Sequence, residues 1–156
     1  AEAINRGWVT GNAGTYYENG IKASMSFYGI TEGAVISITE QDNDLEVGTY
    51  TASVNNYLAQ TSVTYAGNNV TGLNQILMQK YLAFFQNSGQ EAYFNYRRTG
   101  VPAFHAGPGT GNSGIIPKRW LYPVSESTNN EANYKQALQQ QFGGVDDVDN
   151  ELWINQ

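Results

Sequence analysis

Residues 71–85 read TGLNQILMQKYLAFF, and this stretch carries the strongest helical pattern of the chain. Large apolar side chains recur there at spacings of three and four residues, at Leu73, Ile76, Leu77, Tyr81, Phe84 and Phe85. Such spacing places them on one face of a helix. Burying that face contributes on the order of 10 kcal/mol before conformational entropy is counted, at roughly 1.5–3 kcal/mol per large side chain. We therefore expect a core helix here, with Thr71 as its cap.

A second helical pattern lies at the start of the chain. Residues 1–8 predict the end of a helix, and residues 12–29 predict another, which Asn12 caps and Gly29 follows. A short turn between them makes a helical hairpin over 1–29. Gly20 is expected to let a further helix approach closely. Because the pattern begins at residue 1 without a cap, we expect the chain to be a piece of a larger protein.

Two more helices are predicted further along the chain, over 91–99 and 130–142. With the helices above they give a mainly α fold class, in which packed helices are joined by long irregular Pro/Gly loops. An acidic tail, DDVDNELWINQ, follows the last helix.

The region between residues 30 and 70 leaves alternatives open. AVISI (34–38) fits either a strand or a buried helical turn, and QDNDLEVG (41–48) resembles an exposed acidic loop. The stretch 62–69 predicts extended chain followed by a turn. A short helix is predicted from the apolar spacing of Val47, Tyr50, Val54, Tyr57 and Leu58.

Composition excludes several classes of protein. The 156 residues have a net charge of −6 and no basic run, which argues against a nucleic-acid-binding surface. Without cysteine there is no disulfide framework and no thiolate metal site. No apolar run approaches the ~20 residues needed to cross a bilayer. At 156 residues the chain is long enough for one domain with a core.

Positive charge is concentrated beside an irregular loop. All four prolines fall within residues 102–123, among several glycines. Half of the eight Lys and Arg residues flank or lie in that loop, namely Arg97, Arg98, Lys118 and Arg119. Guanidinium groups bind free carbonyls and carboxylates with fixed geometry, and irregular loops have many carbonyls without ladder partners. We interpret Arg97, Arg98 and Arg119 as structural anchors of the loop, with direct ligand contact as the alternative.

Other patterns with possible chemistry are weaker. Residues 109–114 fit GxGxxG, but they follow no strand and open no helix, so a nucleotide site is not expected. His105 has no nucleophile elbow, and no catalytic residue is assigned. Asp42, Asp44 and Glu46 have the oxygen ligands that calcium prefers, but they lack the EF-hand pattern and are interpreted as a solvated loop. No metal site or cofactor is predicted.

Several motifs in order along the chain give a resemblance to a known family. They are AEAxxRGW (1–8), YYENGIKASM (16–25), QKYLAFF (79–85), EAYFNYRRTGVP (91–102), IPKRWLYPVSE (116–126), NxxNYKQAL (130–138) and a final GG…LW (143–153). The chain resembles the C-terminal portion of SusD/RagB-type outer-membrane nutrient-binding lipoproteins, in the SusD-like branch. Trp120 departs from the family pattern, because smaller or aliphatic residues are common there.

The resemblance implies a fold, a location and partners. It implies a tetratricopeptide-like helix pair over 1–29, a variable loop region over 30–70, core helices over 71–100, a Pro/Gly loop over 101–129, and a C-terminal helix and tail over 130–156. These segments form part of one larger SusD-like domain. The expected location is the cell surface of the outer membrane, with a lipid anchor upstream of residue 1. The expected partners are a SusC-type TonB-dependent transporter and a missing N-terminal portion.

The expected function is therefore non-catalytic capture of oligosaccharides, or of peptides, for delivery to that transporter. Candidate ligand contacts are the aromatic residues of loop-like segments, Tyr50, Tyr65, Trp120 and Tyr122, although each also suits packing. Two alternatives remain open: a secreted glycoside hydrolase fragment that uses two acidic residues, and a structural protein-interaction module.

Overall fold

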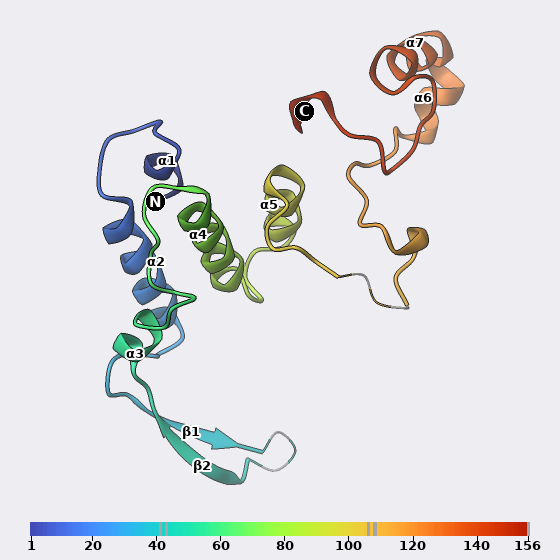
Figure 1. The fold of residues 1–156 in the computed structure, drawn as a ribbon. Coiled ribbons are helices and arrows are strands. Elements are labelled where there is room, and N and C mark those ends of the chain that lie inside the picture. Colours follow the sequence, from blue (N-terminus) through green and yellow to red (C-terminus); the bar gives the residue numbers. More distant parts are fainter. Residues whose placement is uncertain (41, 43, 106, 108, 156) are drawn as a thin grey trace. The chain divides into compact units, whose positions relative to one another are not determined.

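The computed structural model describes residues 1–40, 42, 44–105, 107 and 109–155, and these are mostly helical (Figure 1). The chain divides into two compact units, Ala1–Ala92 and Tyr93–Gln156. The predicted fold class, mainly α, is confirmed. No helix in the described residues is both long and apolar enough to span a membrane.

Among its described residues, the first unit contains four helices and two strands before the unit boundary. They are α1 (Glu2–Asn5), α2 (Ala13–Phe27), β1 (Val35–Thr39), β2 (Glu46–Thr51), α3 (Val54–Leu58) and α4 (Val70–Ala83). Helix α5 (Glu91–Thr99) crosses the boundary, which lies between Ala92 and Tyr93. The core helices expected over 71–100 therefore belong to two units.

Helix α2 begins and ends where its sequence predicts. The Asn12 side chain accepts a hydrogen bond from the backbone N–H of Thr15 at 3.1 Å. At the other end Gly29 has a φ of +75°, and the N–H groups of Gly29 and Ile30 donate to the carbonyls of Ser26 and Met25. This closes the helix with a left-handed glycine, which satisfies carbonyls that would otherwise lack partners.

Helix α4 begins with a different cap from the one predicted. Asn69, not Thr71, has the extended backbone of a cap, and its side chain accepts from the N–H of Gly72 at 2.9 Å. Gly72 allows the preceding turn to fold back closely, since a Cβ atom there would lie 2.0 Å from the carbonyl oxygen of Gly67. The choice between Asn69 and Thr71 thus depends on that close turn.

The core of the first unit lies between α2 and α4. Tyr17, Ile21, Val63 and Ile76 form its buried cluster, and Leu77 is only 1% exposed. The Tyr17 hydroxyl donates to the carbonyl of Val63 at 2.7 Å, and burial raises the pKa of that phenol to about 12, with smaller contributions from nearby charges. The buried hydrogen bond ties the loop after α3 to α2.

Two expectations about packing are wrong. Phe85, the last residue of the predicted apolar stripe, is 66% exposed, because α4 ends before it. A Cβ atom on Gly20 would meet no atom within 4 Å, so no other described segment approaches α2 there.

The region over 30–70 is more regular than expected. β1 and β2 pair as an antiparallel hairpin, with Ile36 opposite Tyr50 and an irregularity after Ile38 (Figure 1). The predicted short helix is correct only for its second half, α3, because Val47 and Tyr50 lie in β2. The apolar spacings of three and four residues in this stretch fit a helix, and the pairing of β2 with β1 overrides them. Gln41 and Asn43 of the expected acidic loop lie outside the described residues.

The second unit contains, besides most of α5, two α-helices and two short 3₁₀ turns. They are η1 (Asn112–Gly114), α6 (Val124–Asn129), α7 (Glu131–Phe142) and η2 (Trp153–Asn155). The predicted C-terminal helix matches α7, which ends at a left-handed Gly143. The Pro/Gly loop predicted over 101–129 is too long, because Val124–Asn129 form α6 behind Pro123.

Candidate functional site

The candidate site is built around residues 117–122 in the second unit. The backbone N–H groups of Lys118 and Arg119 both donate to the carbonyl of Val148, at 2.8 and 3.0 Å, so this segment is held against the acidic tail. Neighbouring side chains then differ sharply in exposure: Arg119 is 4% exposed and Trp120 is 63% exposed.

Arg119 is the buried centre of this arrangement. It forms an ion pair with Asp146 and donates to the carbonyl of Asp147 at 3.0 Å. Its guanidinium also lies over the ring of Phe142, 4.4 Å from the centroid, and near Tyr122 at 5.2 Å. These contacts join the loop to α7 and to the tail.

Asp146 accepts hydrogen bonds from three donors. Besides Arg119, the backbone N–H of Tyr122 and the hydroxyl of Tyr134 donate to it, both at 3.1 Å. Burial by itself would raise the pKa of Asp146, but these donors and the charge of Arg119 outweigh it and hold the pKa below its ordinary value of 3.8. The carboxylate is therefore kept ionised.

Trp120 presents its ring next to α5. The ring meets Tyr93 edge to face, with centroids 6.1 Å apart and planes at 65°. Tyr93 is in turn fixed, because its hydroxyl donates to the carbonyl of Pro117 at 2.6 Å. Trp120 thus contacts a fixed aromatic ring while most of its side chain stays exposed to solvent.

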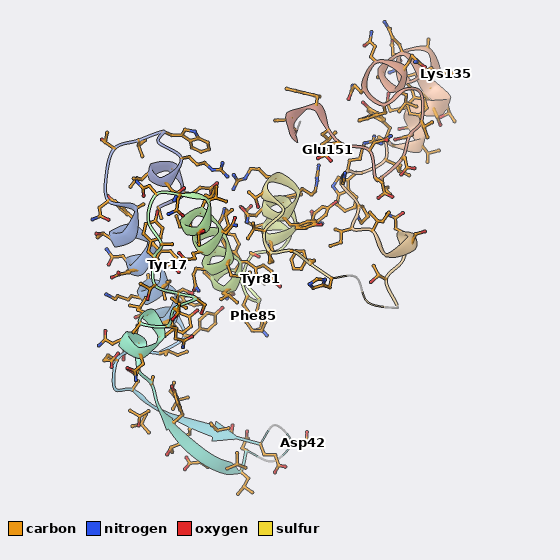
Figure 2. The ribbon with its side chains drawn as sticks, viewed as in Figure 1. Tyr17, Asp42, Tyr81, Phe85, Lys135 and Glu151 are labelled. Atoms are coloured by element: carbon orange, nitrogen blue, oxygen red, sulfur yellow. The ribbon has the colours of Figure 1, made fainter. Side chains whose placement is uncertain are left out.

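A pocket of about 430 Å³ lies in the same unit. We call it the arginine pocket; its chemically distinctive lining residues are Tyr96, Arg97, Phe104, Ile116, Lys118 and Glu151. Figure 2 labels Glu151, which pairs with Lys118 at 2.7 Å. The hydrogen bond that Lys118 donates to that carboxylate raises the pKa of Lys118.

Arg97 is the least satisfied polar group of this pocket. Its guanidinium carbon lies 5.4 Å from the centroid of the Tyr93 ring. Its Nε is buried and finds no hydrogen-bond partner among the residues that the structure describes. A buried donor without a partner is unfavourable by about 1–3 kcal/mol, which an incoming acceptor recovers.

The first unit has a larger hollow with different chemistry. This apolar groove, of about 950 Å³, is lined mainly by α2, the end of α4 and the residues that follow, among them Met25, Tyr28, Tyr57, Tyr81, Leu82 and Phe85. Figure 2 labels Tyr81 and Phe85 on this unit. None of the described residues that line the groove is charged.

The four predicted ligand-contact residues are divided between the two units, with Tyr50 and Tyr65 in the first and Trp120 and Tyr122 in the second. Tyr50 lies on β2 and is exposed, outside both hollows. Tyr65 packs 5.4 Å from the ring of Tyr17, and its hydroxyl bonds to Asn5 and Asn68. Tyr122 packs edge to face on Tyr134 at 5.7 Å. The contacts of Tyr65 and Tyr122 are those of packing residues; Trp120 has the exposure that a ligand contact needs.

The three predicted anchors differ in their contacts. Arg119 lies buried between the loop, α7 and the tail, as described above. Arg98 donates to the side chain of Asn95 at 2.9 Å, within its own helix. Arg97 faces the arginine pocket. That these residues anchor the loop stays a prediction, which their replacement tests below.

The weaker sequence patterns acquire little support from the structure. Residues 109–114 form a turn and η1, not the start of an α-helix. His105 is exposed, as are Asp42, Asp44 and Glu46 at the end of the β hairpin. Over the described part of the chain, no three acidic or histidine side chains form a group suited to a metal ion.

Sequence reasoning did not assign Lys118, Glu151 or Phe104 to a ligand site. The usable signal was the concentration of four cations at one loop in an acidic chain. That signal was interpreted as anchoring, because the pairing of Lys118 with Glu151, more than thirty residues away, is invisible in the sequence.

Comparison with known proteins places the whole chain beside one group. Residues 1–123 match a SusD-like family described as starch-binding and associating with the outer membrane. A solved SusD homologue from Bacteroides fragilis NCTC 9343 is 34% identical over 99% of this chain and 33% of its own length, with a TM-score of 0.78. No curated protein matches.

Two further solved structures are similar. An outer membrane protein of Bacteroides vulgatus ATCC 8482, described in connection with nutrient binding, is 32% identical over 99% of this chain and 32% of its own, with a TM-score of 0.71. A chitin-binding protein is 30% identical over 99% of this chain and 30% of its own, with a TM-score of 0.65. The chain thus spans about a third of the length of these structures.

Proposed function

This chain belongs to the SusD-like family of starch-binding proteins that associate with the outer membrane, and on that premise we propose that it captures an oligosaccharide at the cell surface without altering it. Trp120 and the arginine pocket are the proposed binding site. The observation that carries the proposal is an exposed tryptophan whose ring is held in place beside a pocket with a few polar groups.

The geometry suits a sugar for two reasons. The C–H groups of a pyranose ring form an apolar face, which an exposed indole ring can cover and shield from water. The hydroxyl groups at the edge of the ring need donors and acceptors, which Arg97, Lys118 and Glu151 supply at the pocket. A concave site with a few placed polar groups is the usual form of a ligand site.

The site favours binding over hydrolysis. Glycoside hydrolysis needs one carboxyl group that is protonated near neutral pH. The most enclosed acid near the site, Asp146, is instead held ionised by Arg119 and two further donors. We therefore propose a non-catalytic role, and the expected sign of hydrolysis, new reducing ends in a polysaccharide mixture, should be absent after prolonged incubation.

Delivery of the ligand to a transporter is a proposed role of the full-length protein. We propose that the captured ligand is passed to a SusC-type TonB-dependent transporter, and that a lipid anchor upstream of residue 1 holds the protein at the cell surface. The similarity to an outer membrane protein described in connection with nutrient binding supports this placement. Copurification of a barrel transporter with the full-length protein, and loss of uptake on deletion, are the expected results.

Replacement of Trp120 tests the binding site directly. Chitin and starch oligosaccharides are titrated by calorimetry into the chain and into the Trp120→Ala variant. Loss of a stacked indole should weaken binding by at least about tenfold. Trp8→Ala is the matched control, because Trp8 is as exposed but lies in the first unit, at 67% against 63%. Equal affinities for all three proteins would remove Trp120 from the site.

The same titration separates the remaining alternatives. If no oligosaccharide binds but short peptides do, the ligand class is wrong. If neither oligosaccharides nor peptides bind, the result favours the alternative that the chain is a structural protein-interaction module.

A further inference from the structure

We propose that the arginine pocket binds the carboxylate of an acidic sugar, so that the captured glycan contains uronic-acid residues. This inference rests on the proposed function and adds the chemical class of its ligand. Three observations on the second unit carry it: the unsatisfied Arg97, the charge of the pocket lining and the apolar wall beside the charges.

Arg97 is prepared for a planar anion. Packing against Tyr93 at 5.4 Å orients the guanidinium, and its buried Nε has no partner among the described residues. A carboxylate in the pocket can pair with the guanidinium fork through two parallel hydrogen bonds. Such charge-assisted bonds are stronger than those to a neutral sugar hydroxyl.

The lining has a net positive charge in an acidic chain. Arg97 and Lys118 are two cations and Glu151 is one anion, so two minus one leaves +1, in a chain of net charge −6. Glu151 is bound to Lys118 at 2.7 Å, which leaves Arg97 as the uncompensated charge. The neighbouring carboxylate disfavours ligands of higher negative charge, and a group with a single negative charge fits best.

The apolar lining residues of the pocket suit the sugar ring that bears the acid. The rings of Tyr96 and Phe104 pack together at 5.0 Å, and Ile116 adds an aliphatic surface. Tyr93 contacts both Arg97 and Trp120, so the acid-binding group and the exposed indole are separated by one aromatic residue. One sugar in the pocket and the next on Trp120 are then consecutive units of one chain.

The test compares acidic and neutral sugars of equal length. A galacturonate oligomer and a galactose oligomer are titrated by calorimetry into the 156-residue chain at low and high salt. The acidic oligomer should bind about tenfold more tightly at low salt, since a charge-assisted pair replaces a neutral bond, and the difference should shrink as salt rises. Equal affinities would overturn the inference and leave the proposed function standing; failure of both sugars to bind would also overturn the inference, and the titration with chitin and starch oligosaccharides decides the proposed function separately.

Variants of Arg97 and Arg98 test whether the preference for the acidic sugar arises in the arginine pocket. Arg97→Gln should abolish the preference for the acidic sugar, and Arg97→Lys should keep only part of it, because an ammonium lacks the fork. Arg98→Gln is the matched control: it removes the adjacent arginine of the same helix, which does not line the pocket. A preference that survives Arg97→Gln, or that Arg98→Gln removes equally, would refute the assignment.

A variant that is expected to bind the acidic sugar more tightly completes the test, because misfolding would weaken binding and could not produce this result. Glu151→Gln removes the competing carboxylate and should strengthen binding of the acidic sugar several-fold relative to binding of the neutral sugar. Weaker binding of the acidic sugar in this variant would contradict the proposal. A sulfated oligomer and a peptide with a free C-terminal carboxylate serve as further ligands; binding of either as tight as that of the galacturonate oligomer would overturn uronic acid as the ligand class.

Discussion

The interior of each of the two units is stabilised by different chemistry. The first has an apolar core of Tyr17, Ile21, Val63 and Ile76, and its groove is lined by uncharged residues. In the described part of the second, Leu138 and Pro102 are the buried apolar side chains, whereas Asn95 and Arg119 are buried polar groups. The pocket of the second unit is lined by charged residues.

This difference indicates what each hollow is suited for. A surface without charge offers little to orient a polar ligand beyond neutral hydrogen bonds. A pocket with two cations and one anion does orient a ligand, because charged groups that bind water must be compensated when a ligand displaces it. The unit with the weaker apolar core is therefore the one proposed to bind the ligand.

Removal of Arg119 should have the largest effect on stability. Arg119→Ala leaves Asp146 without its main partner and should lower the free energy of unfolding by about 3–5 kcal/mol. The lower end is expected, because Asp146 is 13% exposed. Chemical denaturation measures the change, with Lys135→Ala as control, since that lysine forms an exposed pair with Glu131. A loss below about 0.5 kcal/mol would show that Arg119 is no anchor.

Truncation in the apolar core should follow. Leu77→Ala creates a cavity at the most buried large side chain and should destabilise the first unit by about 2–5 kcal/mol. Leu82→Ala, on the same helix but 48% exposed, is the control and should change stability far less. Similar losses for both variants would mean that the first unit has no defined core.

Acid should act on the second unit before the first. The pKa of Asp146 is lower in the folded protein than its ordinary value of 3.8, so its stabilisation is present above that pH. It is lost as the pH falls below 3.8 through the folded pKa. The indole N–H resonances in NMR spectra report each unit, Trp120 and Trp153 for the second and Trp8 for the first. Simultaneous loss of all three signals, or loss of Trp8 first, would contradict this prediction.

The smallest effect is expected at the start of α4. Asn69→Ala removes the side chain that accepts from Gly72 and should lower the free energy of unfolding by about 1 kcal/mol. Thr71→Ala, the cap expected from the sequence, should have almost no effect. The reverse ranking of the two variants would restore the sequence-based prediction.

Much of the fold was accessible from local patterns. Asn12, Gly29 and Gly143 mark helix ends as expected, because capping depends on a few neighbouring residues. The hairpin β1–β2 was not predicted, since the spacing of Val47, Tyr50 and Val54 fits a helix, and the pairing of β2 with β1 overrides that spacing. Helix α6 was missed because residues 124–129 have no apolar stripe.

The site was only partly predictable. Trp120 could be singled out from the sequence as an unusual aromatic residue in a loop, and the cluster of cations was visible beside it. Tyr50, Tyr65 and Tyr122 were equally plausible by composition, and only their contacts distinguish them. A residue type says which interactions a side chain can make, whereas packing decides whether the side chain remains available for a ligand.

The sequence by itself determined the mainly α fold class, most helix ends and the family, because these depend on spacing, on caps and on the order of motifs along the chain. Tertiary structure alone decided that Arg119 is buried against Asp146, that the Nε of Arg97 has no hydrogen-bond partner among the described residues, and that Lys118 meets Glu151. These pairings join residues far apart in the chain, and their energies depend on burial and distance, which no local pattern records.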